Sequence, residues 1–168
     1  MKSEMTIDSS TTGFLSLMSI HRALDEMFLL HQEALLDMDL PLASSRLREF
    51  ETALLAHMRN EEELLLPVYA RAGRIAGGSR EMFTGEHKKM VEFISRFHRR
   101  LEEMSDSPAD VKRRILGLLF DEAMFRMLME HHDSREQNIL YPMLDKVTTE
   151  EEKRDLLARC LESAKTTE

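Results

Sequence analysis

The chain has only one cysteine and no long apolar run, and each of these shortages excludes a class of protein. A single cysteine, Cys160, rules out an intrachain disulfide framework of the kind that small secreted domains use. No apolar run approaches the length of a membrane span. The first ten residues, MKSEMTIDSS, lack the apolar core of a signal peptide. Together these observations predict a cytoplasmic protein with no membrane-spanning segment.

Glycine and tryptophan are also scarce. The 168 residues include six glycines and no tryptophan, whereas thirteen are methionine. This balance is typical of a helical protein with a soft, adaptable core, and the length is enough for one domain. The net charge of −8 argues against a nucleic-acid partner, because phosphate binding needs clustered lysine and arginine.

Apolar residues recur with a helical period through almost the whole chain after residue 12. Glycine, proline and capping residues divide this pattern into five predicted helices, at about 12–38, 42–72, 79–104, 108–145 and 148–164. No strand pattern competes with them. Four long helices with short connections predict an all-α protein, an up-down-up-down antiparallel four-helix bundle with a short extra C-terminal helix.

The same pattern predicts three parts of the chain. We expect residues 1–11 to form a poorly ordered N-terminal arm. Residues 12–145 should form the bundle, and residues 146–168 the C-terminal helix and tail. All of these expectations come from local signals, since caps and breakers mark where a helix can begin or end.

One spacing, a histidine followed by a glutamate and then a proline, occurs twice in the chain. The segments HMRNEEELLLP and HHDSREQNILYP both place a glutamate four residues after a histidine and a proline ten residues after it. We expect each proline to bend or end its helix beyond these polar residues. The two copies lie 75 positions apart: His57, Glu61 and Pro67, and His132, Glu136 and Pro142.

The histidines and glutamates of this pattern lie on the apolar faces of their helices. Steps of three and four residues connect them to large apolar side chains, so they point into the core. Two single histidines occupy equivalent positions on the first and third predicted helices. All six polar residues are expected near one end of the bundle: His21, His57, Glu61, His87, His132 and Glu136.

Two buried carboxylates need a positive partner, because an unpaired buried charge is very costly. No lysine or arginine lies beside them on the apolar stripes, so a metal is the expected partner. Four histidines and two glutamates are too many for one tetrahedral zinc ion, and no thiolate is available. Mixed imidazole and carboxylate ligands suit a pair of iron or manganese ions bridged by the glutamates. The other interpretation is a hydrogen-bonded polar core without metal.

Two other metal-site patterns are absent from the sequence. No glutamate lies three residues before a histidine, which disfavours the Glu-x-x-His pattern of ferritin-like di-iron proteins. No His-Glu-x-x-His pattern of zinc proteases occurs either. His131, the rival of His132, is out of register with Glu136 and lies on a more polar face, so we expect it to be peripheral. Asp25 is one turn after His21, and a surface position or a place behind the ligands is expected for it.

His31 and His98 raise a separate question. They follow the single histidines of the first and third helices by ten and eleven residues, which is ~15 Å along the helix and too far for the same centre. We expect both to be hydrogen-bonded near the opposite end of the bundle. A second polar cluster with Asp121 and Glu122, which lie at that level, is the weaker alternative.

The segments HMRNEEELLLP and EHHDSREQNILYP resemble the hallmark segments of the haemerythrin-like (HHE cation-binding) family. The resemblance covers residues 12–145 and includes the single histidines on the first and third helices. It implies a four-helix bundle around two iron ions that can share an oxo or hydroxo bridge, with manganese or zinc as possible substitutes. It also implies the same ligands: His21, His57, Glu61, His87, His132 and Glu136.

The sequence departs from the oxygen-carrying members that it resembles. Those have a His-x-x-x-His pair on the third helix, whereas the residue four positions after His87 is Val91. They also space the last histidine and its carboxylate, an aspartate, one residue wider. The pattern is closer to four-histidine, two-glutamate relatives linked to iron-cluster repair, nitric oxide or oxidative stress, and iron or oxygen sensing. The resemblance therefore implies a small ligand, O₂, peroxide or NO, with simple oxygen carriage the weaker function.

Two other classes of function stay open from the sequence. One is a metal- or oxygen-dependent sensor or regulatory module that acts through a partner protein. The other is a helical interaction protein with a vestigial polar core. Neither the oligomeric state nor enzymatic turnover follows from the sequence.

Overall fold

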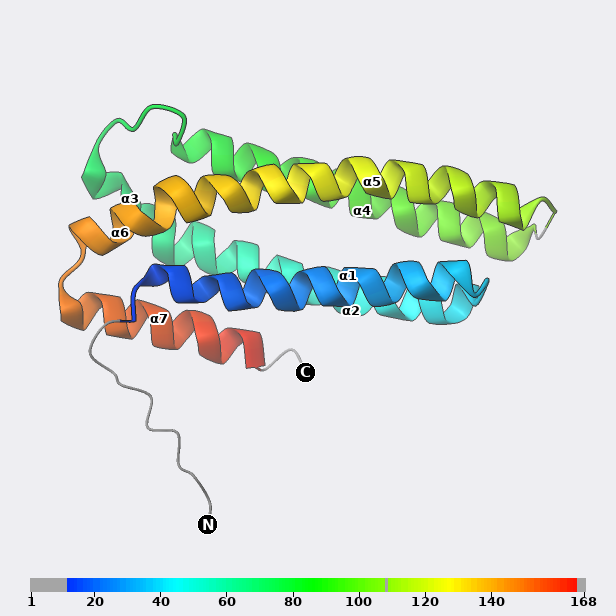
Figure 1. Ribbon diagram of the computed structural model, residues 1–168, viewed down its shortest axis with the longest axis horizontal. Helices are drawn as coiled ribbons and strands as arrows, with labels where there is room; N and C mark the ends of the chain where they lie inside the picture. Colours follow the sequence, from blue (N-terminus) through cyan, green and yellow to red (C-terminus); the bar gives the residue numbers. More distant parts are fainter. Residues whose placement is uncertain (1–11, 108, 166–168) are drawn as a thin grey trace, which may run out of the picture.

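The computed structural model describes residues 12–107 and 109–165, and these are almost entirely helical (Figure 1). No strand occurs within them, in agreement with the predicted all-α class. Within the same residues, no helix has both the length and the apolar character needed to cross a membrane. The predicted N-terminal arm, 1–11, lies outside the described residues. Five described helices are sixteen residues or longer: α1 (Met18–Leu36), α2 (Leu40–Asn60), α4 (Arg80–Asp106), α5 (Val111–Arg135) and α7 (Glu150–Lys165).

Short helical segments extend the long helices. A 3₁₀ turn leads into α1, and a π-helical segment continues each of α2 and α5. The predicted second and fourth helices, 42–72 and 108–145, are therefore each a succession of segments with different helical bonding. The short segments are Phe14–Leu17 (3₁₀), Glu61–Leu65 (π), α3 (Leu66–Tyr69), Ala70–Ala72 (3₁₀), Glu136–Leu140 (π) and α6 (Tyr141–Val147).

The helices α1, α2, α4 and α5 lie side by side along the long axis of the molecule (Figure 1). The helix α1 packs against α2, and α4 packs against α5. Contacts of α2 with α4, and of α1 with α5, connect the two pairs. The helix α7 lies outside them, against α2 and the 3₁₀ turn that precedes α1. The four long helices thus enclose a common interior, and α7 is the extra helix toward the C-terminus.

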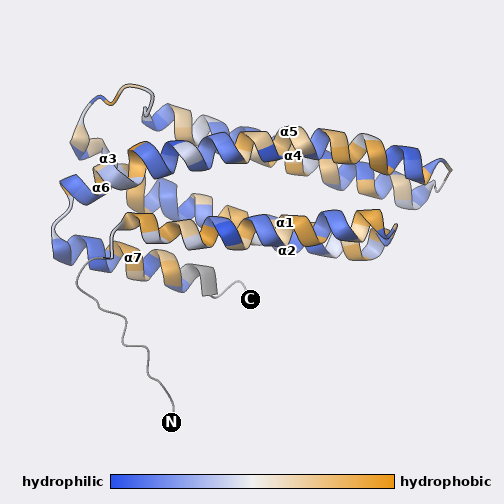
Figure 2. Cartoon of the chain, in the orientation of Figure 1, coloured by the Kyte–Doolittle hydropathy of each residue, from blue (hydrophilic) through white to orange (hydrophobic). Residues whose placement is uncertain are grey.

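The interior contains two apolar layers. Figure 2 shows that apolar and hydrophilic residues alternate along every long helix, as the helical period requires. The phenylalanine layer centres on four fully buried rings whose neighbouring centroids lie 4.9–6.4 Å apart: Phe28, Phe50, Phe97 and Phe125. The second layer, here called the end layer, includes Phe14, Leu17, Leu65, Phe83, Tyr141 and Leu144.

The predicted site histidines lie where the two layers meet. Leu17 belongs to the end layer and Leu24 to the phenylalanine layer, and His21 lies between them in the sequence. Phe83 and Met90 flank His87 in the same way, one in each layer. Each histidine therefore enters the interior between two apolar layers, which keep water away from its polar atoms.

A π-helical segment precedes each proline of the repeated pattern. Proline has no N–H, and its ring clashes with the carbonyl four residues earlier, so α-helical bonding cannot continue unchanged. The wider π turn accommodates the proline, and the chain continues helically as α3 and α6. Neither helix ends at its proline, which corrects that part of the sequence expectation. Glu61 and Glu136 are the first residues of the two π segments, so these widened turns belong to the site.

Capping side chains account for where α2 and α7 begin. Pro41 lies in the first turn of α2, because the Asp39 side chain caps that helix by accepting a hydrogen bond from the backbone N–H of Leu42 (3.0 Å). Thr149 and Glu152 form a capping box at the start of the last helix, each accepting a bond from the other's backbone N–H (3.2 and 2.9 Å). In both helices, residues close in sequence to the helix start therefore determine where it begins.

Replacing Phe125 by alanine tests how much the phenylalanine layer stabilises the fold. Its ring is fully buried and lies 5.1–6.0 Å from four other phenylalanine rings. We expect Phe125→Ala to lower the free energy of unfolding of the metal-free protein by about 3–5 kcal/mol, measured by urea denaturation. Phe120, which is 71% exposed on the same helix, supplies the control, and Phe120→Ala should cost less than about 0.5 kcal/mol. Similar losses in both variants would contradict the packing described.

Candidate metal centre

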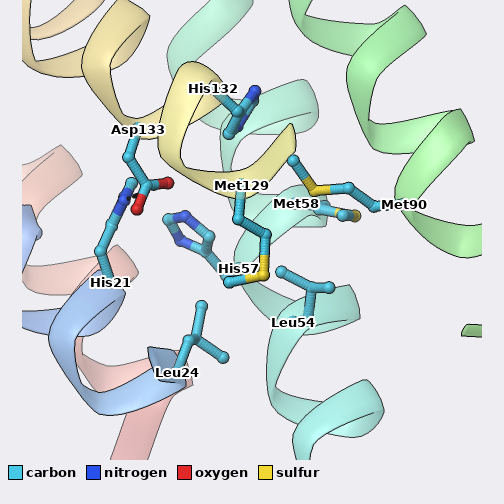
Figure 3. A pocket seen from close by; sticks show the side chains of 9 residues that line it. All are labelled: His21, Leu24, Leu54, His57, Met58, Met90, Met129, His132 and Asp133. Carbon is cyan, nitrogen blue, oxygen red and sulfur yellow. Dashed lines mark ion pairs between the residues drawn. The ribbon is translucent and has the colours of Figure 1, made fainter. Parts of the chain in front are cut away.

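All six residues that the sequence predicts for a metal site lie together between the two apolar layers. The helices α1 and α4 contribute one histidine each, and α2 and α5 contribute one histidine each together with the glutamate of the following π segment. Figure 3 shows three of the histidines approaching one another from α1, α2 and α5. None of the six is more than 8% exposed: His21, His57, Glu61, His87, His132 and Glu136.

The six residues form two groups of four that have both glutamates in common. His21 and His57 complete the first group, and His87 and His132 complete the second. Within each group the nitrogen and oxygen atoms that could bind a metal lie within 4.8 Å of one another, close enough to surround one ion. Two such groups with shared carboxylates offer donors for two neighbouring ions.

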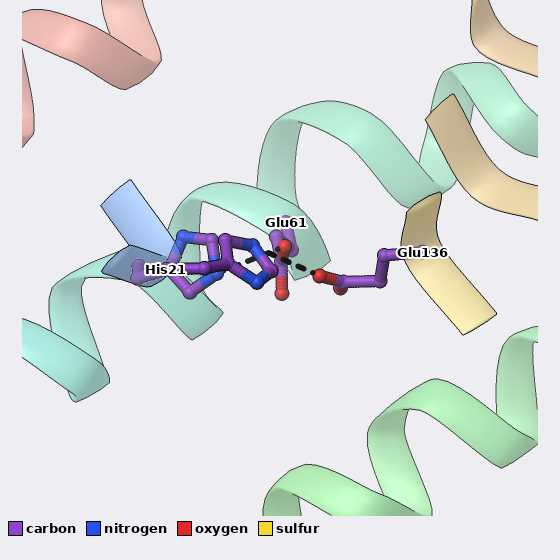
Figure 4. A group of neighbouring side chains, drawn as sticks. His21, Glu61 and Glu136 are labelled. Carbon is purple, nitrogen blue, oxygen red and sulfur yellow. Dashed lines mark ion pairs between the residues drawn. The ribbon is translucent and has the colours of Figure 1, made fainter. Parts of the chain in front are cut away.

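Each glutamate directs one oxygen toward each group. The Oε2 atom of Glu136 lies 3.1 Å from Nε2 of His21, and its Oε1 atom lies 3.0 Å from Nε2 of His132. Glu61 does the same between the remaining two histidines, at 3.2 and 3.1 Å. Figure 4 shows the two carboxylates close together beside His21. This is the placement that a carboxylate needs in order to bridge two metal ions.

Two of the carboxylate oxygens have no hydrogen bond of suitable geometry. They are Oε2 of Glu61 and Oε1 of Glu136, and both are shielded from water. Such an atom is costly in an apolar interior, and a metal ion compensates it directly. The donors are all imidazole nitrogen and carboxylate oxygen, while the one cysteine, Cys160, lies in the end layer. The residues present therefore fit a metal ion that accepts nitrogen and oxygen ligands.

Three further carboxylates hold the histidines from behind. Contacts of this kind fix the orientation of an imidazole ring and leave its Nε2 atom for a metal. Arg135 in turn holds one of these carboxylates, that of Glu86, at 3.0 Å. The Nδ1 atoms of three histidines lie 2.8–2.9 Å from an outer carboxylate: His21 from Asp133, His87 from Glu62, and His132 from Glu86.

The outer carboxylates were not predicted from the sequence. Each is the neighbour in sequence of a predicted site residue, but it pairs with a histidine on another helix. Asp133, for example, follows His132 and yet holds His21. An acidic residue next to a site residue is the only signal in the sequence, and the partner depends on how the helices pack. Asp25, the carboxylate considered near His21, is exposed, as is His131.

Tyr141 is a further residue at the site that was not predicted. Its hydroxyl lies 2.9 Å from Nε2 of His21, 3.3 Å from Glu61 and 3.2 Å from Glu136. Burial, followed by the charges of the two glutamates, raises the pKa of this phenol well above its usual value. The hydroxyl therefore keeps its proton and can donate a hydrogen bond to either shared carboxylate. The one sign in the sequence is that the second copy of the pattern has tyrosine before its proline, where the first has leucine.

In the metal-free protein, protonated histidines balance the buried carboxylates. Burial alone would lower the pKa of His21, but its two carboxylate partners outweigh burial and raise the pKa to about 10. Glu136, with further carboxylates, likewise raises the pKa of His132 well above its usual value despite burial. Burial would raise the pKa of Glu61, yet the surrounding histidines hold it well below its usual range. His57 differs, because burial lowers its pKa.

Two other histidines have partners of their own. The Nδ1 atom of His31 lies 2.8 Å from the carbonyl oxygen of Ala43, and its Nε2 atom lies 2.8 Å from the buried carboxylate of Glu122. His98 pairs instead with Glu51, at 2.8 Å. Both are hydrogen-bonded outside the centre, as expected. Of the second polar cluster that the sequence leaves open, the described residues contain the pair of His31 and Glu122, whereas His98 is not part of it.

A small hollow adjoins the centre on the side of the phenylalanine layer. Its volume is about 10 Å³, which is room for about one water-sized molecule. Figure 3 shows Met58, Met90 and Met129 among the side chains that line it. Apart from the site histidines and Asp133, the residues that line the hollow are apolar. A small molecule at the centre would therefore be shielded from bulk water.

Tyr141→Phe removes the phenolic hydroxyl and keeps the ring. We expect the metal affinity to fall about 10–100-fold, because the shared carboxylates lose a hydrogen-bond donor, and competition with a chromophoric chelator measures it. Tyr69 provides the control, because its hydroxyl donates to the carbonyl of Gly78 (2.7 Å), away from the six residues. Tyr69→Phe should leave the affinity within about twofold. Equal losses in both variants would rule out a specific effect of Tyr141.

Metal binding should release protons near neutral pH. The pKa of His21 is about 10, so the metal-free protein is protonated there at pH 7, whereas a metal-bound nitrogen is not. The raised pKa stabilises the metal-free fold below pH 6.5, and this stabilisation is lost as the pH rises through about 10. Calorimetry in buffers of different ionisation enthalpy should detect about one proton released from this residue, and fewer in His21→Gln. Binding without proton release at pH 7 would contradict the assignment.

Comparison with known families agrees with this geometry. The model of the family described as Hemerythrin HHE cation binding domain matches residues 12–144, and this span includes all six residues of the two groups. No curated protein and no solved structure matches the chain. The match covers well over half of the chain. The chain therefore belongs to the haemerythrin HHE cation-binding domain family.

Proposed function

We propose that the protein is a non-haem di-iron protein that binds or reacts with O₂, peroxide or NO. The observation that carries this proposal is the pair of four-residue groups that share Glu61 and Glu136. Shared carboxylates hold two ions next to each other, which a single ion would not require. We assign one ion to the first group and the other to the second. The proposed ligands are His21, His57, Glu61, His87, His132 and Glu136.

We also propose that α1, α2, α4 and α5 form an up-down-up-down antiparallel four-helix bundle, within residues 12–145. Short connections between consecutive helices support it, as does the packing of α1 on α2 and of α4 on α5. In such a bundle, each of the four helices can present one histidine at the same level. The six proposed ligands then need no long loop to bring them together.

Iron, with manganese or zinc as substitutes, suits this donor set. Structural zinc sites are almost always tetrahedral and often contain thiolates, whereas six nitrogen and oxygen donors divided over two ions favour iron or manganese. Bound iron supplies redox chemistry and an open position for a small ligand. The residues of the chain orient the donors, since the outer carboxylates fix three imidazoles and Tyr141 holds the shared carboxylates. The methionines and leucines around the hollow exclude water.

The surroundings of the centre favour a small ligand, and the residue at position 91 argues against reversible oxygen carriage. The hollow beside His57 has a volume of about 10 Å³ and mostly apolar walls. Val91, where oxygen carriers have another histidine, is partly buried and lines a groove on the surface. The centre therefore has fewer protein ligands than a carrier. We propose a role in oxidative or nitrosative stress or in iron homeostasis, and a cytoplasmic location in view of the single cysteine.

Metal analysis tests the ligand assignment. After anaerobic loading with ferrous iron and removal of free metal, the protein should retain about two iron ions per chain. His57→Ala and Glu136→Ala should each retain less than about one, because each removes a proposed ligand. The exposed His131 gives the matched control, and His131→Ala should retain the full content. Unchanged iron in the first two variants would show that the assignment is wrong.

Absorption spectroscopy tests the proposed class of ligand. Iron-loaded protein should change its visible spectrum on mixing with at least one of O₂, hydrogen peroxide and NO, because an open iron position can bind them. Glu136→Ala, which lacks a shared carboxylate, should lose the response. A loaded protein that responds to none of the three would exclude this function while leaving metal binding intact.

A further inference from the structure

A groove on the surface and the small hollow beside the centre have one lining residue in common. The groove lies between α2, the π segment that follows it and α4, and has a volume of about 520 Å³. Its lining includes Met58, Glu62, His87, Lys88 and Val91. Of the residues that line the groove and the hollow, Met58 alone lines both. Its side chain therefore borders both the surface groove and the hollow beside the centre.

Met58 and His87, both on the groove, differ in how firmly their contacts hold them. Both Met58 and His87 are almost fully buried there, at 5% and 3% exposure. His87 is held at both nitrogens, with Nδ1 2.8 Å from Glu62 and Nε2 3.1 Å from Glu61. Methionine is unbranched and has three rotatable bonds, so it can change rotamer without moving the backbone. A rotation of this one side chain is enough to alter the wall between the two spaces.

A second way into the hollow would pass Asp133 on the α1–α5 side. The side chain of Asp133 is 21% exposed and lies 2.8 Å from Nδ1 of His21. Moving it would remove the group that orients a proposed metal ligand, and its negative charge would repel anions. Met129, which also lines the hollow on that side, is only 5% exposed. The α2–α4 side is the easier path, because no hydrogen bond has to break there.

We propose that Met58 gates the passage of small ligands from the α2–α4 groove to the metal centre and thereby selects them by size and charge. The hollow behind it is small, with a volume of about 10 Å³, so bulky ligands do not fit. Its apolar walls disfavour ions, which would have to lose their hydration. Uncharged molecules of the size of O₂, NO or hydrogen peroxide satisfy both conditions. The destination of the ligand rests on the proposed function, but passage itself does not require the metal.

Passage can be measured in the metal-free protein with dioxygen as the probe. The chain has two tyrosines and no tryptophan, so in a Tyr69→Phe background Tyr141 is the only strong fluorophore. Its hydroxyl lies 2.9 Å from His21, next to the hollow. In this background, Met58→Ala should raise the rate constant for quenching by dioxygen under pressure about threefold or more, because it removes the gate. Met129→Ala enlarges the same hollow without touching the groove, and should change the constant less than about 1.5-fold.

A second substitution keeps the test decisive if the alanine variant does not fold. Met58→Ile keeps roughly the same volume but stiffens the first side-chain torsion, so it should lower the quenching constant about twofold or more. Circular dichroism checks that each variant retains its helices. The proposal is overturned if both Met58 variants quench like the parent, or if Met129→Ala raises the constant as much as Met58→Ala does.

In the iron-loaded protein, the association rate constant of NO should likewise rise in Met58→Ala and fall in Met58→Ile. Stopped-flow absorption measures these constants at equal iron content. If the protein holds no iron, the proposed function fails while the quenching experiment still decides on the gate. If iron binds but neither the quenching constants nor the NO association constants change in the Met58 variants, the proposed gate is wrong and the proposed function stands.

Discussion

Glu61 and Glu136 are buried between two apolar layers, and the rest of the structure depends on how their charge is compensated. Within the described residues, their ion pairs are all with histidines, and no lysine or arginine reaches either carboxylate. Leaving such charges unpaired would cost of order several kcal/mol each. Without metal, protonated imidazoles supply the balancing charge. With metal bound as proposed, the same imidazoles would lose their protons and serve as ligands, so one set of residues would serve both states.

The fold places these groups at one level through two local devices. The first is the helical period, which aligns each histidine with the apolar stripe of its own helix, between a residue of the phenylalanine layer and one of the end layer. The second is the π segment that starts at each shared glutamate and accommodates the proline that follows. The chain continues helically past both prolines, and Tyr141, the residue directly before the second proline, places its hydroxyl at the two carboxylates. The repeated spacing of histidine, glutamate and proline thus encodes both an inward-facing histidine–glutamate pair and the turn that positions it.

The helices and the six inward-facing residues could be predicted because their signals are local. Apolar periodicity marks the buried face, and a repeat 75 residues apart identifies His132 rather than its neighbour His131. The helical rise correctly separates His31 from the centre. The outer carboxylates could not be predicted, because whether Asp133 meets His21 or another histidine depends on the rotation of α5 against α1. Tyr141 was missed for a similar reason, since only the assembled interior shows that its hydroxyl reaches both glutamates.

The central claim is that Glu61 and Glu136 hold two metal ions between them. Anomalous scattering at the iron edge, from crystals of iron-loaded protein, measures this most directly, because it locates each ion independently of the protein model. The claim predicts two peaks about 3–4 Å apart, each next to one oxygen of both glutamates. A single peak, or peaks outside the two groups of histidines, would contradict it.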